Sequence, residues 1–206
     1  MRADEHIARE GIVTLGRALY DRGLTPGRTG NLSVKVGPQV VITPTGACLG
    51  RLSAPELSVI ELDGTHVHGP APTKESALHL ALYRRDPSVN AVAHGHTTYA
   101  VAWSCRPNLN ADNAIPPLTA YFAMRVGRLP LIGYAKPGDP VLAQKLALVD
   151  KSCALLANHG SITSGANLEA AVDALEEIEE TARIAFLLDK LPSTPLTDAQ
   201  VRQLGR

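Results

Sequence analysis

The sequence has no excess of charge of either sign, because twenty lysine and arginine residues balance twenty aspartate and glutamate residues. Without a net positive field, nothing draws the chain to a nucleic-acid backbone or to an anionic membrane surface. No uninterrupted apolar run approaches the ~20 residues of a membrane-spanning helix, and the charged opening MRADEHIARE lacks the apolar segment of a signal peptide. We therefore expect a cytoplasmic protein with no nucleic-acid partner and no membrane association.

Cysteine is scarce as well. Cys48, Cys105 and Cys153 are odd in number, lie far apart and form no CxxC pair, which argues against a disulfide framework and against a thiolate metal site. The motif GxxxxGK followed by Ser or Thr is absent, and so is GxGxxG, which argues against a nucleoside triphosphate or a dinucleotide as ligand. A serine nucleophile elbow is also missing.

What is present is an ordinary globular composition. Apolar residues make up 45% of the 206 residues and charged residues 19%, which separates this chain from disordered proteins. Because domains commonly hold about 150 residues, one domain is the simplest division of this length. We therefore expect residues 1–206 to form a single domain.

Apolar periodicity and turn residues predict the elements of the fold. Two antiparallel hairpins are expected around Gly37-Pro38 and Asp63-Gly64, joining Leu32–Val36 to Val40–Thr43 and Val59–Leu62 to Thr65–Val67. Helices are expected over Glu5–Tyr20, from the N-cap Thr73 to the residue before Asp86-Pro87, from the N-cap Asp139 to about Val149, and after Asn167. Such alternation of helices and short strands predicts an α/β fold with an antiparallel or mixed sheet.

Two further strand-like runs, Val89–His96 and Cys153–Asn158, each lead to a histidine. The intervening segment Asn108–Gly138 is rich in proline and glycine, so we expect mainly loop with one strand near Leu129–Tyr134. The tail after Pro192 is polar. Four glutamates of the last long helix are expected to form a solvated face: Glu176, Glu177, Glu179 and Glu180.

The sequence His94-Gly95-His96 predicts a metal platform. Side chains two apart on a strand point to the same face, and Gly95 between the two rings would leave room for an ion. Catalytic zinc commonly takes three protein ligands, and His159, at the end of the second run, is the candidate for the third. A single histidine at a strand end is, however, also typical of an ordinary surface or core residue.

Other residues bear on this prediction. His66 and His68 repeat the spacing of the pair, but they follow a tight turn in an exposed setting and are interpreted as structural, as are His6 and His79. Glu75 lies in the predicted first turn of a helix, where the helix dipole favours any carboxylate. Beside a metal, the same carboxylate could ligate the ion or move a proton.

Five sequence blocks, taken in order, resemble the class II aldolase/adducin family over roughly residues 5 to 190. The blocks are Gly30-Asn31-Leu32-Ser33, Thr43-Pro44-Thr45-Gly46, Pro72-Thr73-Lys74-Glu75, His94-Gly95-His96 and Asn158-His159-Gly160. Within the family, the block ending in Glu75 and the segments Ile115–Thr119 and Pro137–Pro140 are most similar to the 3-oxo-tetronate 4-phosphate decarboxylases.

The resemblance implies a three-layer α/β/α sandwich around a mostly antiparallel sheet, and a homotetramer with active sites between neighbouring subunits. It also implies one Zn²⁺, or another divalent metal, per subunit. The implied metal ligands are His94, His96, His159 and Glu75, with Glu75 as the acid/base. The implied phosphate-binding residues are Gly30, Asn31, Thr45, Gly46, Thr73 and Lys74. Tyr121 is the nearest match to a tyrosine that family members contribute to an adjacent subunit.

The activity implied by the resemblance is decarboxylation of 3-oxo-tetronate 4-phosphate to dihydroxyacetone phosphate and carbon dioxide through a metal-stabilised enediolate. Many sugar-phosphate aldolases of the family have Ser-Ser before the glutamate, whereas this chain has Thr73-Lys74. A lysine beside a divalent cation suits a strongly anionic substrate, although it could also extend into solvent. The alternatives are a sugar-phosphate aldolase or epimerase and a non-catalytic adducin-like interaction module, which the complete set of ligands argues against.

Overall fold

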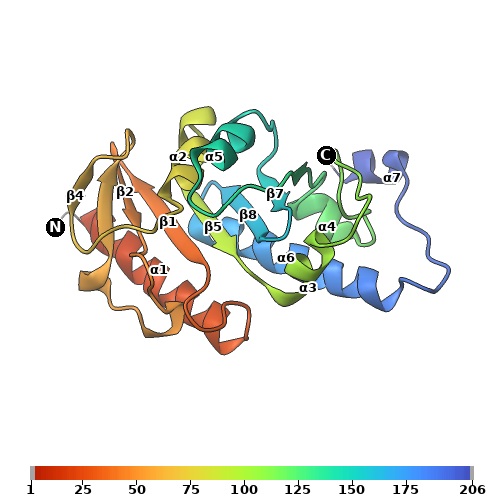
Figure 1. Cartoon of the computed structure of the whole chain (residues 1–206), viewed down its shortest axis with the longest axis horizontal. Coiled ribbons are helices and arrows are strands. Elements are labelled where there is room, and N and C mark those ends of the chain that lie inside the picture. Colours follow the sequence, from red (N-terminus) through yellow and green to blue (C-terminus); the bar gives the residue numbers. More distant parts are fainter. Residues whose placement is uncertain (1–2, 205–206) are drawn as a thin grey trace.

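Two tight turns organise the N-terminal half of the sheet in the computed structural model, which describes residues 3–204 (Figure 1). Strands β1 (Asn31–Val36) and β2 (Gln39–Ile42) pair antiparallel across Gly37-Pro38. Strands β3 (Ser58–Glu61) and β4 (His66–His68) pair antiparallel across Asp63-Gly64, where Gly64 adopts a φ of 99°. Both predicted hairpins are confirmed.

The sheet continues through strands from the second half of the chain. These are β5 (Ala91–Gly95), β8 (Gly160–Gly165), β7 (Cys153–Leu156) and β6 (Leu131–Ile132), which gives the order β4-β3-β2-β1-β5-β8-β7-β6. Every neighbouring pair is antiparallel except β6 and β7, which are parallel. The sheet is therefore mostly antiparallel, as expected.

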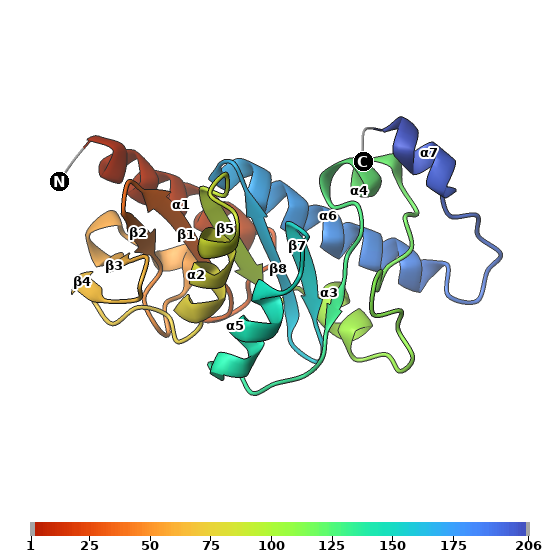
Figure 2. The same ribbon diagram turned by 90° about the horizontal axis from the view of Figure 1, so that it is seen from above.

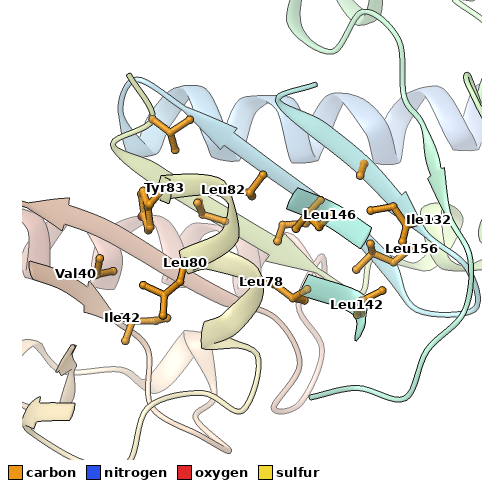
Figure 3. Packing of buried hydrophobic residues seen from close by; sticks show 14 of the residues in the cluster. Val40, Ile42, Leu78, Leu80, Leu82, Tyr83, Ile132, Leu142, Leu146 and Leu156 are labelled. Carbon is orange, nitrogen blue, oxygen red and sulfur yellow. The ribbon is translucent and has the colours of Figure 1, made fainter. Parts of the chain in front are cut away.

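Helices cover both faces of this sheet (Figure 2). On one face lie α2 (Ser76–Arg85) and α5 (Pro140–Ala147), whose leucines pack over the strands (Figure 3). On the other lie α1 (Ala3–Asp21) and α6 (Leu168–Leu187). Successive strand residues alternate between the two cores: Val40 and Ile42 face α2, whereas Val41 faces α1. The three-layer α/β/α expectation is confirmed.

Several shorter elements were not predicted. Helix α3 (Thr98–Ser104) follows β5 and packs against α6, and α4 (Ala120–Arg125) lies inside the segment expected to be mainly loop. Strand β8, with the sequence GSITSG, contains glycine and serine at four of its six positions, and both residue types give only a weak strand signal. The polar tail contains α7 (Asp198–Gln203), which begins with a capping box. Two 3-10 turns, η1 (Leu49–Arg51) and η2 (Ala54–Glu56), lie between β2 and β3.

The predicted start of α2 at Thr73 is wrong. The helix begins at Ser76, and Glu75 occupies the N-cap position with a φ of −97° and a ψ of 10°. The Thr73 hydroxyl instead accepts a hydrogen bond from the Glu75 amide within the turn before the helix. Glu75 therefore precedes the first turn instead of lying in it, and its side chain is free to point away from the helix.

The expectation of a solvated acidic face on α6 is wrong for Glu179. Only 7% of this residue is exposed, and its two carboxylate oxygens accept hydrogen bonds from the Tyr99 and Ala100 amides at 2.9 and 2.8 Å. These amides belong to the first turn of α3, whose N–H groups have no partner within the helix. Glu179 thus holds α3, and the segment after β5, against α6.

None of the helices within residues 3–204 has both the length and the apolar character needed to cross a membrane.

Replacing two different glycines by alanine is expected to change the free energy of unfolding in opposite directions. A Cβ at Gly50 would lie 2.3 Å from the Tyr20 ring, whereas a Cβ at Gly11, inside α1, would lie 3.8 Å from the nearest atom. We expect Gly50→Ala to lower the free energy of unfolding by ~1–3 kcal/mol through overpacking. Gly11→Ala should raise it by ~0.5–1 kcal/mol, because alanine favours the helix. Urea denaturation measures both, and equal shifts in the two variants would contradict this account.

Candidate metal centre

Strand β5 positions two of the predicted ligands. His94 lies on the strand and His96 directly follows its last residue, and their Nε2 atoms are 2.9 Å apart. The His94 Nδ1–H donates to the Ser161 carbonyl on β8 at 2.8 Å, and this hydrogen bond directs the Nε2 atom of the ring toward His96. The structure therefore brings both rings of the pair together.

The expected role of Gly95 is wrong. A Cβ at this position would lie 2.9 Å from a methyl group of Leu175 on α6. Glycine is therefore needed because α6 packs closely on the end of β5, on the side of the strand away from the two rings. The space for an ion does not depend on it.

A tight turn between β7 and β8 supplies His159. Asn158 adopts a φ of 56° and Gly160 a φ of 151°, and a Cβ at Gly160 would lie 2.3 Å from the Gly95 carbonyl oxygen. This close approach of the turn to the end of β5 places the His159 ring centroid 4.9 Å from that of His94 and 4.7 Å from that of His96. His159 therefore joins the pair from a distant part of the sequence.

The fourth member, Glu75, comes from the N-cap of α2. Glu75 Oε1 lies 3.0 Å from His159 Nε2, and Glu75 Oε2 lies 3.3 Å from His94 Nε2. The side chain is 11% exposed, and Oε2 also accepts a hydrogen bond from Asn31 Nδ2 at 2.9 Å. One ligand atom from each of the four residues lies within 4.8 Å of the others. We call these residues the His₃Glu group.

The surroundings of Glu75 and His96 favour the protonation states that bind metal ions. Burial raises the pKa of Glu75. The charge interaction with His94 and the hydrogen-bonding groups of His159, His94 and Asn31 outweigh this effect and bring the pKa below its ordinary value. Burial lowers the pKa of His96 to about 3, and the adjacent His94 and His159 add to this shift. At neutral pH the carboxyl is therefore ionised and the His96 ring is neutral, which are the states that bind metal ions.

The donor atoms fit a divalent cation. Glu75 Oε1 and His159 Nε2 are buried and face each other, yet among residues 3–204 neither has a partner with hydrogen-bond geometry. A buried polar atom without a partner costs about 1–3 kcal/mol. A cation between three imidazole nitrogens and a carboxylate oxygen would satisfy all of them, and such nitrogen and oxygen ligands suit Zn²⁺ and other transition metals.

The predicted phosphate-binding residues gather next to this group. Gly30, Asn31, Thr45, Gly46, Thr73 and Lys74 all line one hollow of about 230 Å³, together with Glu75 and His96. Gly30 and Gly46 both adopt positive φ values, and a Cβ at Gly30 would lie 3.0 Å from the His94 carbonyl oxygen. We call this space the cationic hollow, because it also contains two positive charges.

The second of these charges, Arg28, was missed in the sequence. Arg28 lines the cationic hollow and is exposed, and its Nη1 lies 3.9 Å from the position of a Cβ at Gly46. The ion pairs found among residues 3–204 involve neither Arg28 nor Lys74. A basic residue two positions before Gly30-Asn31 was the signal that could have identified it.

A second hollow of about 560 Å³ adjoins the His₃Glu group on the side of α3. Its lining contains no lysine or arginine: His96, Thr98, Val101, Ala102, Pro137, Asn158 and His159. His96 and Pro137 line both hollows, so the two spaces meet at the candidate metal centre. We call this space the neutral hollow.

The remaining histidines lie outside the group. His6, His66 and His68 are exposed, and His79 is fully buried between Ser33 and Asn31. Tyr121 lies on α4, is 63% exposed and lines neither hollow in this chain.

Comparison with known proteins agrees with this geometry. The family model described as "Class II Aldolase and Adducin N-terminal domain" matches residues 10–186. The chain belongs to the class II aldolase and adducin family. It is 46% identical to a 3-oxo-tetronate 4-phosphate decarboxylase of Haemophilus influenzae, over 95% of each chain. It is 31% identical to an L-fuculose phosphate aldolase of Methanococcus maripaludis, over 87% of this chain and 97% of that one.

Solved structures of the family have the same fold. The crystal structure of YgbL from Klebsiella pneumoniae, described as an aldolase, epimerase or decarboxylase, superposes with a TM-score of 0.94 at 41% identity and covers 97% of this chain and 98% of its own. An L-fuculose 1-phosphate aldolase superposes with a TM-score of 0.89 at 27% identity, over 99% and 95% of the two chains. The family assignment expected from the five sequence blocks is confirmed.

The HxH sequence occurs twice in this chain, which provides a matched test of the metal centre. We expect His96→Ala to lose most of the bound divalent metal, because it removes one of the converging ring nitrogens. His66→Ala removes an exposed histidine with the same spacing and should retain about one ion per chain. Metal analysis after dialysis measures both, and loss of metal from both variants, or from neither, would place the ion elsewhere.

Proposed function

We propose that this chain is a metal-dependent carbon–carbon lyase that converts 3-oxo-tetronate 4-phosphate to dihydroxyacetone phosphate and carbon dioxide. The observation that carries the proposal is the direct contact between the His₃Glu group and the cationic hollow, which joins a candidate metal centre to a site for an anion. The relatives named 3-oxo-tetronate 4-phosphate decarboxylase support this substrate, because five of them share 38–46% identity with the chain.

In this proposal, His94, His96, His159 and Glu75 hold one Zn²⁺ per subunit. When bound, such an ion supplies Lewis-acid polarisation of a substrate carbonyl. Zinc is favoured by three imidazole nitrogens and a carboxylate oxygen, although the same ligands accept other divalent metals. The hydrogen bond from His94 Nδ1 to the Ser161 carbonyl fixes the ring that faces the ion.

The two anionic ends of the substrate occupy different hollows in this proposal. We assign the phosphate to the cationic hollow, where Arg28 and Lys74 supply charge and the turns at Gly30 and Gly46 bring backbone N–H groups close. The carboxylate then lies toward the neutral hollow. Departure of carbon dioxide leaves the electron pair of the C1–C2 bond on C2. Glu75, after its carboxylate has taken up a proton from water, delivers that proton to C2.

The function and the proton-delivery role are tested together with Glu75→Gln. The amide keeps an oxygen for the metal but carries no acidic proton, so we expect metal content near that of the parent protein and a loss of kcat of at least ~100-fold. Carbon dioxide release from 3-oxo-tetronate 4-phosphate measures the activity. Glu56→Gln, an exposed carboxylate in η2, is the control.

Two results would contradict these assignments. Full activity of Glu75→Gln would remove Glu75 from proton transfer. Aldehyde release from a ketose phosphate by the parent protein, with no carbon dioxide from the acid, would favour the second candidate, a sugar-phosphate aldolase or epimerase. The similarity to L-fuculose phosphate aldolases is the observation behind that candidate.

The role of Arg28 makes a separate prediction. A hydrogen bond to a charged group contributes about 1.5–3 kcal/mol, which corresponds to roughly 10–100-fold in affinity. We expect Arg28→Ala to raise KM for the phosphorylated substrate by this factor while kcat changes little, because phosphate contacts persist through the reaction. Arg51→Ala, in η1 and outside the cationic hollow, should leave KM unchanged. An unchanged KM in Arg28→Ala would show that Arg28 does not contact the phosphate.

We extend the proposal to a cytoplasmic homotetramer in which residues 1–206 form one catalytic domain. The exposed Tyr121 and Met124 of α4 support a contact between subunits, because large side chains of this kind are enriched at interfaces. Light scattering of the purified protein gives the subunit count.

A further inference from the structure

A chain of hydrogen bonds leads from the interior of the protein to the candidate metal centre. Tyr83 Oη lies 2.7 Å from Ser33 Oγ, and Ser33 Oγ lies 2.7 Å from His79 Nδ1. His79 Nε2 lies 2.5 Å from Asn31 Oδ1, and Asn31 Nδ2 lies 2.9 Å from Glu75 Oε2. Tyr83, Ser33, His79 and Asn31 are each at most 5% exposed. The chain therefore ends on the carboxylate of the His₃Glu group.

The spacing of these residues shows how the chain arises. Glu75, His79 and Tyr83 are four residues apart and form one stripe along α2 and its N-cap. Asn31 and Ser33 are two apart and lie on one face of β1. Where α2 packs over the sheet, the polar stripe meets the polar pair in alternation, so that each bond joins the helix to the strand. Apolar residues of the same core, including Leu78 and Leu82, surround it.

The direction of every bond follows from the chemistry of the groups. The ionised Glu75 carboxylate can only accept, so the Asn31 NH₂ group faces it and Asn31 Oδ1 faces His79. Because Oδ1 can only accept, His79 Nε2 carries the proton and donates. Burial lowers the pKa of His79 to about 3, so the ring is neutral and its Nδ1 accepts from the Ser33 hydroxyl. Ser33 Oγ in turn accepts from the Tyr83 hydroxyl, whose pKa burial raises above its ordinary value. Each link then has one donor and one acceptor.

The same directions determine the orientation of the Asn31 amide. With Oδ1 toward His79, the NH₂ group faces Glu75 and donates to Oε2. A rotated amide would place its NH₂ against the His79 N–H and its oxygen against the carboxylate, which replaces two attractive contacts by two repulsive ones. The carboxylate and the His79 Nε2–H therefore favour the same amide orientation, and the Nε2–H stabilises the orientation that holds Glu75.

We propose that His79 is a positioning residue of the active site: its Nε2–H orients the Asn31 amide, which holds Glu75 Oε2 toward the three histidines. The effect on turnover rests on the proposed function, whereas the effect on metal affinity does not. The sequence analysis interpreted His79 as structural, and the geometry adds this second role. Asn31 also lines the cationic hollow, so its orientation affects both sides of the site.

Two amide substitutions separate positioning from packing. In His79→Gln, the side-chain NH₂ can occupy the place of Nε2 and still donate to Asn31. In His79→Asn, the shorter amide can reach the place of Nδ1 beside Ser33 but leaves Asn31 without its donor. A role in packing alone predicts similar losses in both variants, whereas positioning predicts that only the shorter amide damages the site.

The first measurement is the dissociation constant for Zn²⁺, obtained by competition with a chelator. We expect His79→Gln to stay within about 3-fold of the parent protein and His79→Asn to bind 10–100-fold more weakly, the usual effect of losing a partner that orients a metal ligand. Tyr83→Phe should lower the melting temperature without changing Zn²⁺ affinity, because Ser33 keeps its own proton for His79. Equal weakening in all three variants would overturn the proposal.

The second measurement requires no substitution and therefore does not depend on whether the variants fold. Nitrogen-15 NMR of the metal-free parent protein should show His79 protonated on Nε2 and unprotonated on Nδ1 at pH 7. The opposite tautomer, or a doubly protonated ring, would overturn the proposal. Neither measurement uses a substrate, so a failure to release carbon dioxide would contradict the proposed function while leaving this inference to be judged on its own results.

Discussion

The structure must hold the three imidazoles and the carboxylate of the His₃Glu group close to one another in a mostly buried space. Burial removes the water that would otherwise solvate the carboxylate and the imidazole nitrogens, and Glu75 Oε1 and His159 Nε2 have no partner with hydrogen-bond geometry among residues 3–204. Their convergence must therefore be enforced by the surrounding backbone. The ladder between β5 and β8 and the turn at Asn158-His159-Gly160 provide this enforcement, because Gly160, which has no side chain, lets the turn lie directly against the end of β5.

The register of the sheet links this group to the place where an anion would bind. Asn31 of β1 is directly opposite His94 of β5, so a residue that was expected to bind phosphate lies beside a candidate metal ligand. On the other side of β5, β8 leads back through the turn to His159. The cationic hollow thus lies on the β1 side and the neutral hollow on the side of α3, which gives the site two chemically different ends.

Local patterns predicted the parts of the molecule that depend on local physics. The glycine turns located both hairpins, and alternation on a strand placed His94 and His96 on one face. Contacts between distant segments could not be predicted in this way. Glu179 is buried because it caps α3, and position 95 must be glycine because a side chain there would meet Leu175. Glu75 is the N-cap of α2 and does not lie in its first turn. Strand β8 has weak strand propensity and is stabilised by its two neighbours.

Although the chain has no net charge, lysine and arginine line one of the two hollows and not the other. This difference bears on the choice between lyase reactions. Decarboxylation and aldol cleavage both leave an electron pair on the same carbon and differ in the group that departs. A departing carboxylate loses its charge as it becomes carbon dioxide, so a lining without lysine or arginine does not stabilise the charged reactant over the neutral product. A cation there would favour the reactant and oppose the reaction. Within one chain, the confinement of Arg28 and Lys74 to the cationic hollow is therefore consistent with decarboxylation.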